Sequence, residues 1–414
     1  MSQAEIVFHN TLSGKKETFV PANPEHVSIY VCGPTVYSYV HIGNGRPAVV
    51  FDVLTRLLRT RYPKVSYVSN ITDIDDKINA TAASNGEDIQ TLADRYSQAY
   101  QEDVTALGVR PPDVVPKATH HIAEIIDMIE TLITKEHAYT SEGHVLFHVP
   151  SDPEYGSLSK RSLEDMIDGA RVEVAGYKKD PKDFVLWKPS TEDQPGWNSP
   201  WGRGRPGWHI ECSAMVKKHL GDTIDIHGGG SDLTFPHHEN EAAQSRCAND
   251  NPGYVRYWLH NGMLNLGTEK MSKSVGNVVA PQQVMDKLGA DILRLWVSSN
   301  DYSGEMAVSD EILKRTADAY RRIRNTSRFL LSNLNGFEPE RDALAFDDML
   351  ALDQWVVDRA AQLQARVELA YEEYRFLDIY QQVLTFCSRE LGGFYLDVIK
   401  DRQYTTQPNS RARR

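Results

Sequence analysis

Short apolar runs alternate with amphipathic stretches over the first two thirds of the chain. Residues 27–33 (VSIYVCG) and 65–71 are compact apolar runs. Between them, from about residue 47 to the proline at 63, apolar positions repeat at helical spacing. The order strand, loop, helix, strand predicts a parallel unit with buried strands. Apolar runs that begin at residues 224 and 255 indicate two further strands.

The pattern changes twice along the chain. Residues 85–205 hold two helical stretches, one with an isoleucine stripe expected in the core, then a small hairpin layer and a loop over 190–207, and we interpret them as an inserted connective region. After the proline at 281 the pattern is helical, with no recurring strand. The sequence thus predicts an α/β fold: a Rossmann-like, doubly wound parallel-sheet domain over residues 1–280 and a C-terminal α-helical bundle over 281–414.

Composition narrows the class of protein. The chain has 414 residues, of which 41% are hydrophobic and 25% charged, as in water-soluble globular proteins. It lacks an export signal and any apolar run of about 20 residues, so we expect a cytoplasmic protein without a membrane span. The net charge of −12 argues against a protein that coats nucleic acid. Four cysteines are too few for a disulfide framework and favour metal or nucleophile roles.

Metal-ligating residue types gather around residues 223–241 (TIDIHGGGSDLTFPHHENE). This stretch predicts a strand, a glycine turn and a helix that begins near residue 236. His237 and Glu241 are four residues apart, so one helix face presents both, and His238 is the alternative imidazole. Cys212 lies upstream in a predicted loop, and Cys32 follows the first strand. Two thiolates, an imidazole and a carboxylate form a plausible zinc set.

Phosphate-binding candidates lie on both sides of this stretch. HIGN, with His41 and Asn44, stands at a predicted helix N-terminus, which favours anions. The stretch LGTEKMSKSVGN carries Lys270 and Lys273. NITDIDDK, with Thr72, follows the second strand at the edge where open α/β sheets bind ligands.

HIGN and KMSKS in this order resemble the two signatures of class I aminoacyl-tRNA synthetases. The resemblance implies ATP with Mg²⁺ as substrate, attack of an amino-acid carboxylate on the α-phosphate, and transfer of the acyl group to tRNA. It implies catalytic roles for His41, Asn44, Lys270 and Lys273. Asn44 departs from the family's more usual histidine, although an amide can still donate a hydrogen bond.

Over residues 1 to about 270 the chain resembles cysteinyl-tRNA synthetases, in YVCGPTVY, KATHHI, GRPGWHIECSAM, DIHGGGSDL and FPHHENE. This resemblance implies one Zn²⁺ on Cys32, Cys212, His237 and Glu241, which binds the thiolate of the substrate L-cysteine. The implied ATP-binding residues are His41, Gly43, Asn44, Asp232 and Lys273. The implied substrate-binding residues are Gly33, Thr35, Thr72, Trp208 and His227.

The C-terminal part is similar to the anticodon-binding helical domain of isoleucyl-tRNA synthetases, shortened, in stretches such as AYRRIRNTSRFLLSNLNGF. It implies that the arginine-rich helix near Arg321 tracks tRNA backbone and that a shortened bundle exposes an apolar face. We expect a monomer.

Three rival functions remain open. A related group of enzymes joins activated cysteine to an amino sugar without tRNA. A binding or regulatory protein could keep this fold without the second step. A fusion with an isoleucine-type tail could form the adenylate and choose tRNA poorly.

Overall fold

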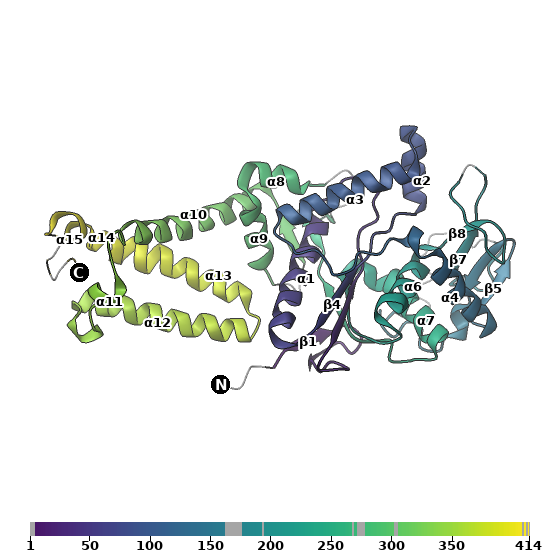
Figure 1. Cartoon of the computed structure of the whole chain (residues 1–414), viewed down its shortest axis with the longest axis horizontal. Coiled ribbons are helices and arrows are strands. Elements are labelled where there is room, and N and C mark those ends of the chain that lie inside the picture. The colour runs from purple at the N-terminus through teal and green to yellow at the C-terminus, as the bar shows by residue number, and fades with distance from the viewer. Residues whose placement is uncertain are drawn as a thin grey trace.

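A central parallel sheet organises the molecule (Figure 1). The computed structural model describes residues 5–161, 176–192, 194–266, 269–270, 278–301, 305–407, 410 and 413, with only the backbone of 266, 269 and 270. The sheet order is β10 (Val255–Asn261), β9 (Ile224–Gly230), β3 (Val27–Val31) and β4 (Val65–Ser69), all parallel. The predicted strand–helix–strand unit is confirmed, since α1 (Ile42–Arg61) joins β3 to β4. The helix begins earlier than expected, before Pro47.

Helices cover both faces of this sheet, which confirms the doubly wound prediction. Ile29 and Val31 of β3 pack in one cluster with Phe51 of α1. Tyr30, between them, packs on the opposite face with α6 (Trp208–Leu220) and α7 (Glu239–Asn249). Alternate residues of a strand point to opposite faces, so β3 is buried on both sides.

The connective region forms a second layer. Its antiparallel sheet runs β5 (Ala138–Ser141), β6 (His144–Phe147), β7 (Phe184–Pro189) and β8 (Gly204–Pro206). The isoleucine stripe on α4 (Ile122–Thr134) is core as predicted: Ile125, Ile129 and Leu132 are fully buried, in one cluster with residues of α6 and α7. The layer therefore supports the helices that carry the metal-ligating candidates.

Three expectations from the sequence are wrong. The glycines at 228–230 belong to β9 and not to a turn, since they pair with residues 259–261 of β10. Residue 228 is glycine because a Cβ there would lie 2.2 Å from the Phe51 ring. Residues 208–214 are the start of α6 and not a loop, since Gly207 acts as its N-cap. A strand does follow residue 281: β13 (Met306–Val308) pairs with β11 (Leu264–Leu266). Short segments of this kind are set by their partners more than by local pattern.

The remaining elements are short or peripheral. They are β1 (Val7–Asn10), β2 (Lys15–Thr18), α2 (Asp76–Asn85), α3 (Ile89–Ala106), η1 (Ala118–His120), η2 (Val149–Ser151), η3 (Ser231–Leu233), η4 (Thr234–His238), β12 (Glu269–Lys270), α8 (Pro281–Leu288) and α9 (Ala290–Ser298). Helices α8 and α9 pack on α1 in one cluster that includes Leu293, Trp296 and Ile42. No helix in the described ranges has both the length and the apolar composition that crossing a bilayer requires.

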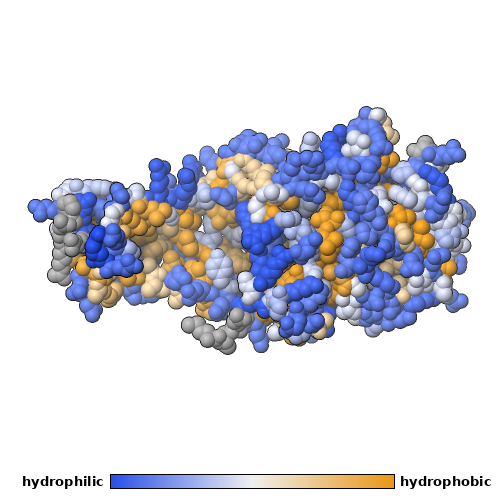
Figure 2. Space-filling model, in the orientation of Figure 1, coloured by the Kyte–Doolittle hydropathy of each residue, from blue (hydrophilic) through white to orange (hydrophobic). Residues whose placement is uncertain are grey.

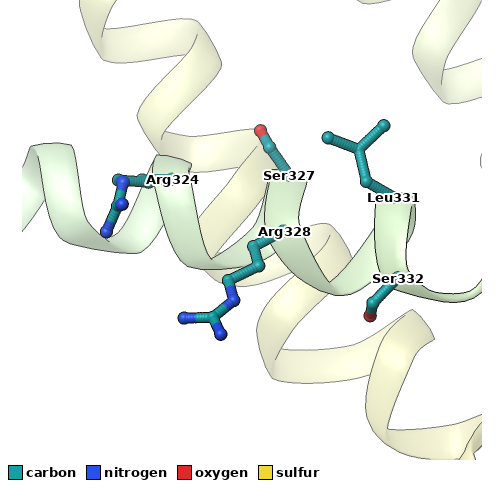
Figure 3. A pocket seen from close by; sticks show the side chains of 5 residues that line it. All are labelled: Arg324, Ser327, Arg328, Leu331 and Ser332. Atoms are coloured by element: carbon teal, nitrogen blue, oxygen red, sulfur yellow. The ribbon is translucent and has the colours of Figure 1, made fainter.

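The C-terminal segment is a thin helical layer, drawn from green to yellow in Figure 1. It comprises α10 (Asp310–Ser332), α11 (Pro339–Asp342), η5 (Phe346–Asp348), α12 (Ala351–Glu372), α13 (Phe376–Thr385), η6 (Phe386–Tyr395), α14 (Leu396–Val398) and α15 (Lys400–Thr405). Its buried cluster consists of Val356, Leu391, Leu396 and Ile399. Figure 2 shows apolar surface over this layer. A hollow of about 480 Å³ lies on α10, lined by Arg324, Ser327, Arg328, Leu331 and Ser332 (Figure 3).

Candidate functional site

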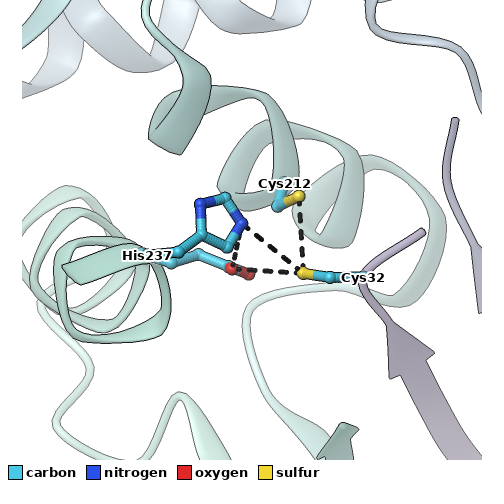
Figure 4. Close-up of side chains that lie close together, drawn as sticks. Cys32, Cys212 and His237 are labelled. Carbon is cyan, nitrogen blue, oxygen red and sulfur yellow. Dashed lines mark hydrogen bonds and ion pairs between the residues drawn. The ribbon is translucent and has the colours of Figure 1, made fainter. Parts of the chain in front are cut away.

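Four ligand-type side chains from separate parts of the chain meet at the carboxyl end of β3 (Figure 4). Cys32 follows β3, Cys212 comes from α6, His237 from η4 and Glu241 from α7. One ligand atom of each lies within 4.8 Å of those of the other three. The sequence prediction of a single four-residue cluster therefore agrees with the geometry.

The distances between these atoms match the edges of a zinc tetrahedron. Cys32 Sγ lies 3.7 Å from Cys212 Sγ, 3.6 Å from His237 Nε2 and 3.8 Å from Glu241 Oε2. Zn–S bonds of about 2.3 Å and Zn–N bonds of about 2.0 Å give edges of about 3.8 Å between sulfurs and about 3.5 Å between sulfur and nitrogen. The donor set and its spacing fit Zn²⁺.

Neighbouring rings orient His237. His237 Nδ1 lies 3.0 Å from His209 Nδ1, which leaves Nε2 facing the cysteines. The Trp208 ring stacks on the His237 ring with centroids 4.2 Å apart, and Trp208 is 37% exposed. A ligand histidine held through its other nitrogen has one tautomer and one orientation. Trp208, an implied substrate-binding residue, thus lies between His237 and the solvent-exposed side of the cluster.

Burial controls the protonation of the cluster. Burial, followed by the neighbouring Cys212, raises the pKa of the Cys32 thiol well above its usual value. Burial raises the pKa of Glu241 to about 8 and holds the pKa of His237 well below its usual value. Without a cation these groups are therefore neutral at pH 7, and a bound divalent cation would displace the protons from the thiol and the carboxyl.

A second histidine layer lies behind the four side chains. His227 Nε2 is 2.7 Å from Glu241 Oε1, and His238 Nε2 is 3.3 Å from Cys32 Sγ. His227 and His238 also form a possible ligand set with Cys32 and Glu241, so His238 stays the alternative imidazole. His238 Nδ1 in turn lies 2.7 Å from His260 Nε2. His227 is fully buried and stacks on Trp258, so its predicted contact with substrate stays a prediction.

His41 and Asn44 form a capping box at the start of α1. His41 Nδ1 accepts from Gly43 N at 3.1 Å, and Asn44 Oδ1 accepts from His41 N at 3.2 Å. The first amides of the helix are engaged too, since Ile42 N donates to Val279 O and Asn44 N to His41 O. Phosphate contacts here would come from side-chain donors, His41 Nε2 and Asn44 Nδ2, and not from the helix amides that the sequence suggested.

The loops after β3 and β4 are held together by a hydrogen bond and a short β-bridge. Gly33 N donates to Asn70 Oδ1 at 2.9 Å, and a Cβ on Gly33 would lie 1.6 Å from Asn70 O, so only glycine permits this approach. Thr35 and Thr72 form a parallel bridge, and Thr72 is 1% exposed. Three predicted substrate-binding residues therefore lie together beside Cys32.

Of the remaining predicted residues, the structure describes Asp232 in full and only the backbone of Lys270. Asp232 lies exposed on η3, next to Gly230. The backbone of Lys270 belongs to β12 and pairs with Asn265. Lys273 lies outside the described residues. The roles of both lysines stay predictions.

Two buried residues of the site carried no prediction of function. Tyr254 Oη lies 3.0 Å from Glu241 Oε1, so it helps to orient a candidate ligand. Glu211, beside Cys212, is 1% exposed, and burial raises its pKa well above the usual value. The only sequence signal for Glu211 is a carboxyl group in the first turn of a helix next to a candidate ligand, which is too common to be informative.

Comparison with known proteins gives consistent matches over most of the chain. Residues 18–318 match the tRNA synthetase class I (C) catalytic domain, and residues 353–414 match the anticodon-binding domain of tRNA ligase. The first match extends beyond residue 280, and α8, α9 and β13 pack with α1 in the same region. The resemblance of the C-terminal part to an anticodon-binding domain is confirmed.

Individual relatives indicate the same family as the matched domains. A protein of Parvibaculum lavamentivorans named cysteine--tRNA ligase is 56% identical over 354 residues, which span 85% of this chain and 75% of the relative. One of Saccharophagus degradans with the same name is 57% identical over 311 residues, which span 75% and 68%. The structure of methionyl-tRNA synthetase from Mycobacterium tuberculosis with methionyl-adenylate has a TM-score of 0.68 at 16% identity, covers 94% of this chain and 87% of its own, and shows the shared fold. The chain therefore belongs to the cysteine--tRNA ligase family of class I tRNA synthetases.

Proposed function

We propose that this protein is a cysteine--tRNA ligase that activates L-cysteine with ATP and transfers it to tRNA, and that it selects cysteine through a zinc ion. The observation that carries this proposal is the four-residue cluster at the carboxyl end of β3, beside the loops expected to bind substrate. The family membership of the chain supports the same activity.

Selection of cysteine follows from the ligand chemistry. Zn²⁺ on Cys32, Cys212, His237 and Glu241 would supply a Lewis-acidic position that accepts a thiolate far more readily than the hydroxyl of serine. Trp208 stacks on His237 at the partly exposed side of the cluster and would exclude water beside the bound side chain. A site that requires a metal-binding thiolate discriminates against an analogue that lacks one by roughly 10⁴-fold, so a separate editing site is not needed.

Activation needs donors around the α-phosphate and no protein nucleophile. His41 Nδ1 accepts the Gly43 amide, which puts the proton of the neutral ring on Nε2, where it can donate to phosphate. We assign Asn44, Lys270 and Lys273 to the same task, with Mg²⁺ entering on ATP. Preorganised donors of this kind stabilise the charge that builds on the phosphates as the carboxylate attacks.

The basic face of α10 supports tRNA as the acceptor. Arg315 and Arg321 form ion pairs with acidic residues on α10 itself. Arg324 and Arg328 line the hollow and form no ion pair with another described residue (Figure 3). Two unpaired guanidinium groups one helical turn apart suit successive phosphates of a backbone. The match to an anticodon-binding domain favours tRNA over an amino sugar. The cytoplasmic location and the monomeric state stay expectations.

The test is cysteine-dependent ATP–pyrophosphate exchange, run with cysteine, serine and isoleucine before and after metal removal. We expect exchange with cysteine alone, loss of exchange on chelation, and recovery with Zn²⁺. Charging of total tRNA in the same preparation separates the ligase from an enzyme that stops at the adenylate. Equal exchange with serine, or full exchange in verified metal-free protein, would refute the assignment.

A further inference from the structure

One carboxyl group beside the cluster lacks any counter-charge. Glu211, in the first turn of α6, is 1% exposed. Neither of its oxygens accepts a hydrogen bond of good geometry in the described part of the chain, although the neutral hydroxyl of Thr72 lies close enough to interact with it. Leaving a buried polar group unpaired costs about 1–3 kcal/mol, and more for a charge, so such a group calls for a missing partner.

The neighbours of Glu211 differ from it in this respect. Asp73 accepts from Thr119 N at 3.0 Å and Thr119 Oγ1 at 2.5 Å. Asp75 accepts from Lys77 N at 2.8 Å and caps α2. Both aspartates, and the thiol of Cys212, act electrostatically on Glu211. The surroundings of Glu211 are therefore negative or neutral, which favours a cation at its oxygens.

Among the described residues, the groups that act on Glu211 include no basic side chain, and the basic residues around the neighbouring Asp76 are engaged elsewhere. Lys188 and Arg205 both form ion pairs with Asp76. Lys77 lies over the Tyr37 ring, 5.7 Å from its centroid. The cation that fits Glu211 must therefore come with a ligand.

Cysteine carries such a cation at the right place. Glu211 precedes Cys212 in the chain, and it also interacts with Thr72, which bridges to Thr35 in the loop after Cys32. In cysteine two carbon atoms separate sulfur from nitrogen, so a thiolate held at the four-residue cluster puts the ammonium group within reach of its immediate surroundings. We propose that Glu211 binds the α-ammonium group of substrate cysteine and so distinguishes cysteine from thiols that lack an amino group. This inference rests on the proposed function, because it needs the thiolate at the metal.

The test measures binding and not catalysis. Holoenzyme is prepared with Co²⁺ in place of Zn²⁺. Cys32 and Cys212 already give a thiolate-to-cobalt absorption band, so the change in this band on addition of ligand reports dissociation constants for cysteine and for 3-mercaptopropanoate, which lacks the amino group. For the unaltered protein we expect cysteine to bind at least about 100-fold more tightly, since the analogue leaves the buried carboxyl of Glu211 without its charged partner. In Glu211→Gln we expect this ratio to fall to within about fivefold, mainly through weaker cysteine binding. Because both ligands bind the same metal through a thiolate, a general change in the metal site affects both dissociation constants and leaves their ratio unchanged.

The control is Glu239→Gln. Glu239 is also fully buried, but its Oε2 accepts from Ser159 N at 2.7 Å, so its variant should keep the ratio of the unaltered protein. If Glu211→Gln fails to fold, Glu211→Asp retains the charge with a shorter reach, and a ratio lowered at least tenfold supports the assignment. An unchanged ratio in the folded variant overturns the role of Glu211 and leaves the proposed function intact. A cobalt band that does not change when cysteine is added to the unaltered protein overturns the thiolate contact, and with it both proposals.

Discussion

The helix that carries the metal-ligating carboxylate and the helices of the C-terminal layer differ sharply in burial. Nine of the eleven residues of α7 are buried, including Glu239, Asn240 and Glu241. Of the 22 residues of α12 only Val356 and Ala370 are buried, and α13 has no buried residue. Among the residues that the structure describes, thirteen of the 21 exposed large apolar side chains lie at or after Leu330.

This difference follows from what each region must do. A metal tetrahedron tolerates errors of only tenths of an ångström, so its ligands need packed and hydrogen-bonded surroundings on all sides. Contact with a long, uniformly charged backbone needs charge at the surface more than fixed geometry. The stability of the molecule is therefore concentrated in the α/β part, and the four predictions that follow test that division.

The largest effect is expected at the metal cluster. Cys212→Ser should lose bound zinc and lower cysteine-dependent exchange by more than about 100-fold, since altering even a residue that only supports a ligand costs 10- to 100-fold. Metal content and exchange rate are measured together. Cys247→Ser is the matched control, because Cys247 is a buried thiol in the hydrophobic cluster of the connective layer, and it should keep both zinc and activity. Equal losses in the two variants would contradict the ligand assignment.

Acid should unfold the α/β part first. All 14 histidines lie at or before His260. Burial lowers the pKa of His209 to about 4 and those of His227 and His260 to about 3. Because these folded pKa values lie below the unfolded value of about 6.5, the folded protein keeps their stabilisation above that pH and loses it as the pH falls.

The loss approaches about 1.4 kcal/mol per imidazole per pH unit, or about 5 kcal/mol for the three between pH 6.5 and 5. Glu241, whose folded pKa of about 8 lies above its unfolded value, offsets about 2 kcal/mol of this loss in the metal-free protein. Urea unfolding at several pH values measures it, and hydrogen exchange locates it. Protection should fall in β9 and α6 before α12. Simultaneous loss in both regions would argue that the two parts unfold as one unit.

Two tryptophans sharpen the comparison of packing. Trp296 of α9 is 1% exposed and packs in the cluster with α1, whereas Trp355 of α12 is 36% exposed. Trp296→Ala should lower the free energy of unfolding by about 3–5 kcal/mol, and Trp355→Ala by much less. Urea denaturation of both variants measures the difference. Similar losses would mean that the C-terminal layer is packed as tightly as the α/β core.

The smallest effect is expected on α10. Reversing the charge of Arg324 and Arg328 should raise the KM for tRNA about tenfold and reduce the salt dependence of charging, while exchange stays unchanged. Arg315→Ala is the control, since Arg315 is already paired with Glu311. A change in exchange as large as the change in charging would place these arginines in the support of the α/β site and not on tRNA.

The sequence predicted that these four side chains come together, because their residue types are those of a zinc site. His237 and Glu241 are four residues apart, and Cys32 ends an apolar strand, so residue type and spacing were sufficient. Cys212 was included by residue type, as a second thiol just upstream, and the resemblance to a known family implied the same four residues. The helix that holds Cys212 was missed, because glycine, proline and tryptophan around residue 207 are as typical of a loop as of a helix start.

The sequence by itself determined the residue types of the site, the apolar run that buries β3 on both faces, and the confinement of histidine to the α/β part. Only the tertiary structure decided how those residues are used. It engages the first amides of α1, connects Glu241 to His227 and Tyr254, and leaves Glu211 without a charged partner among the described residues. The physical reason is that hydrogen bonding and desolvation depend on which groups from distant segments fill the same small volume, and no spacing along the chain encodes that.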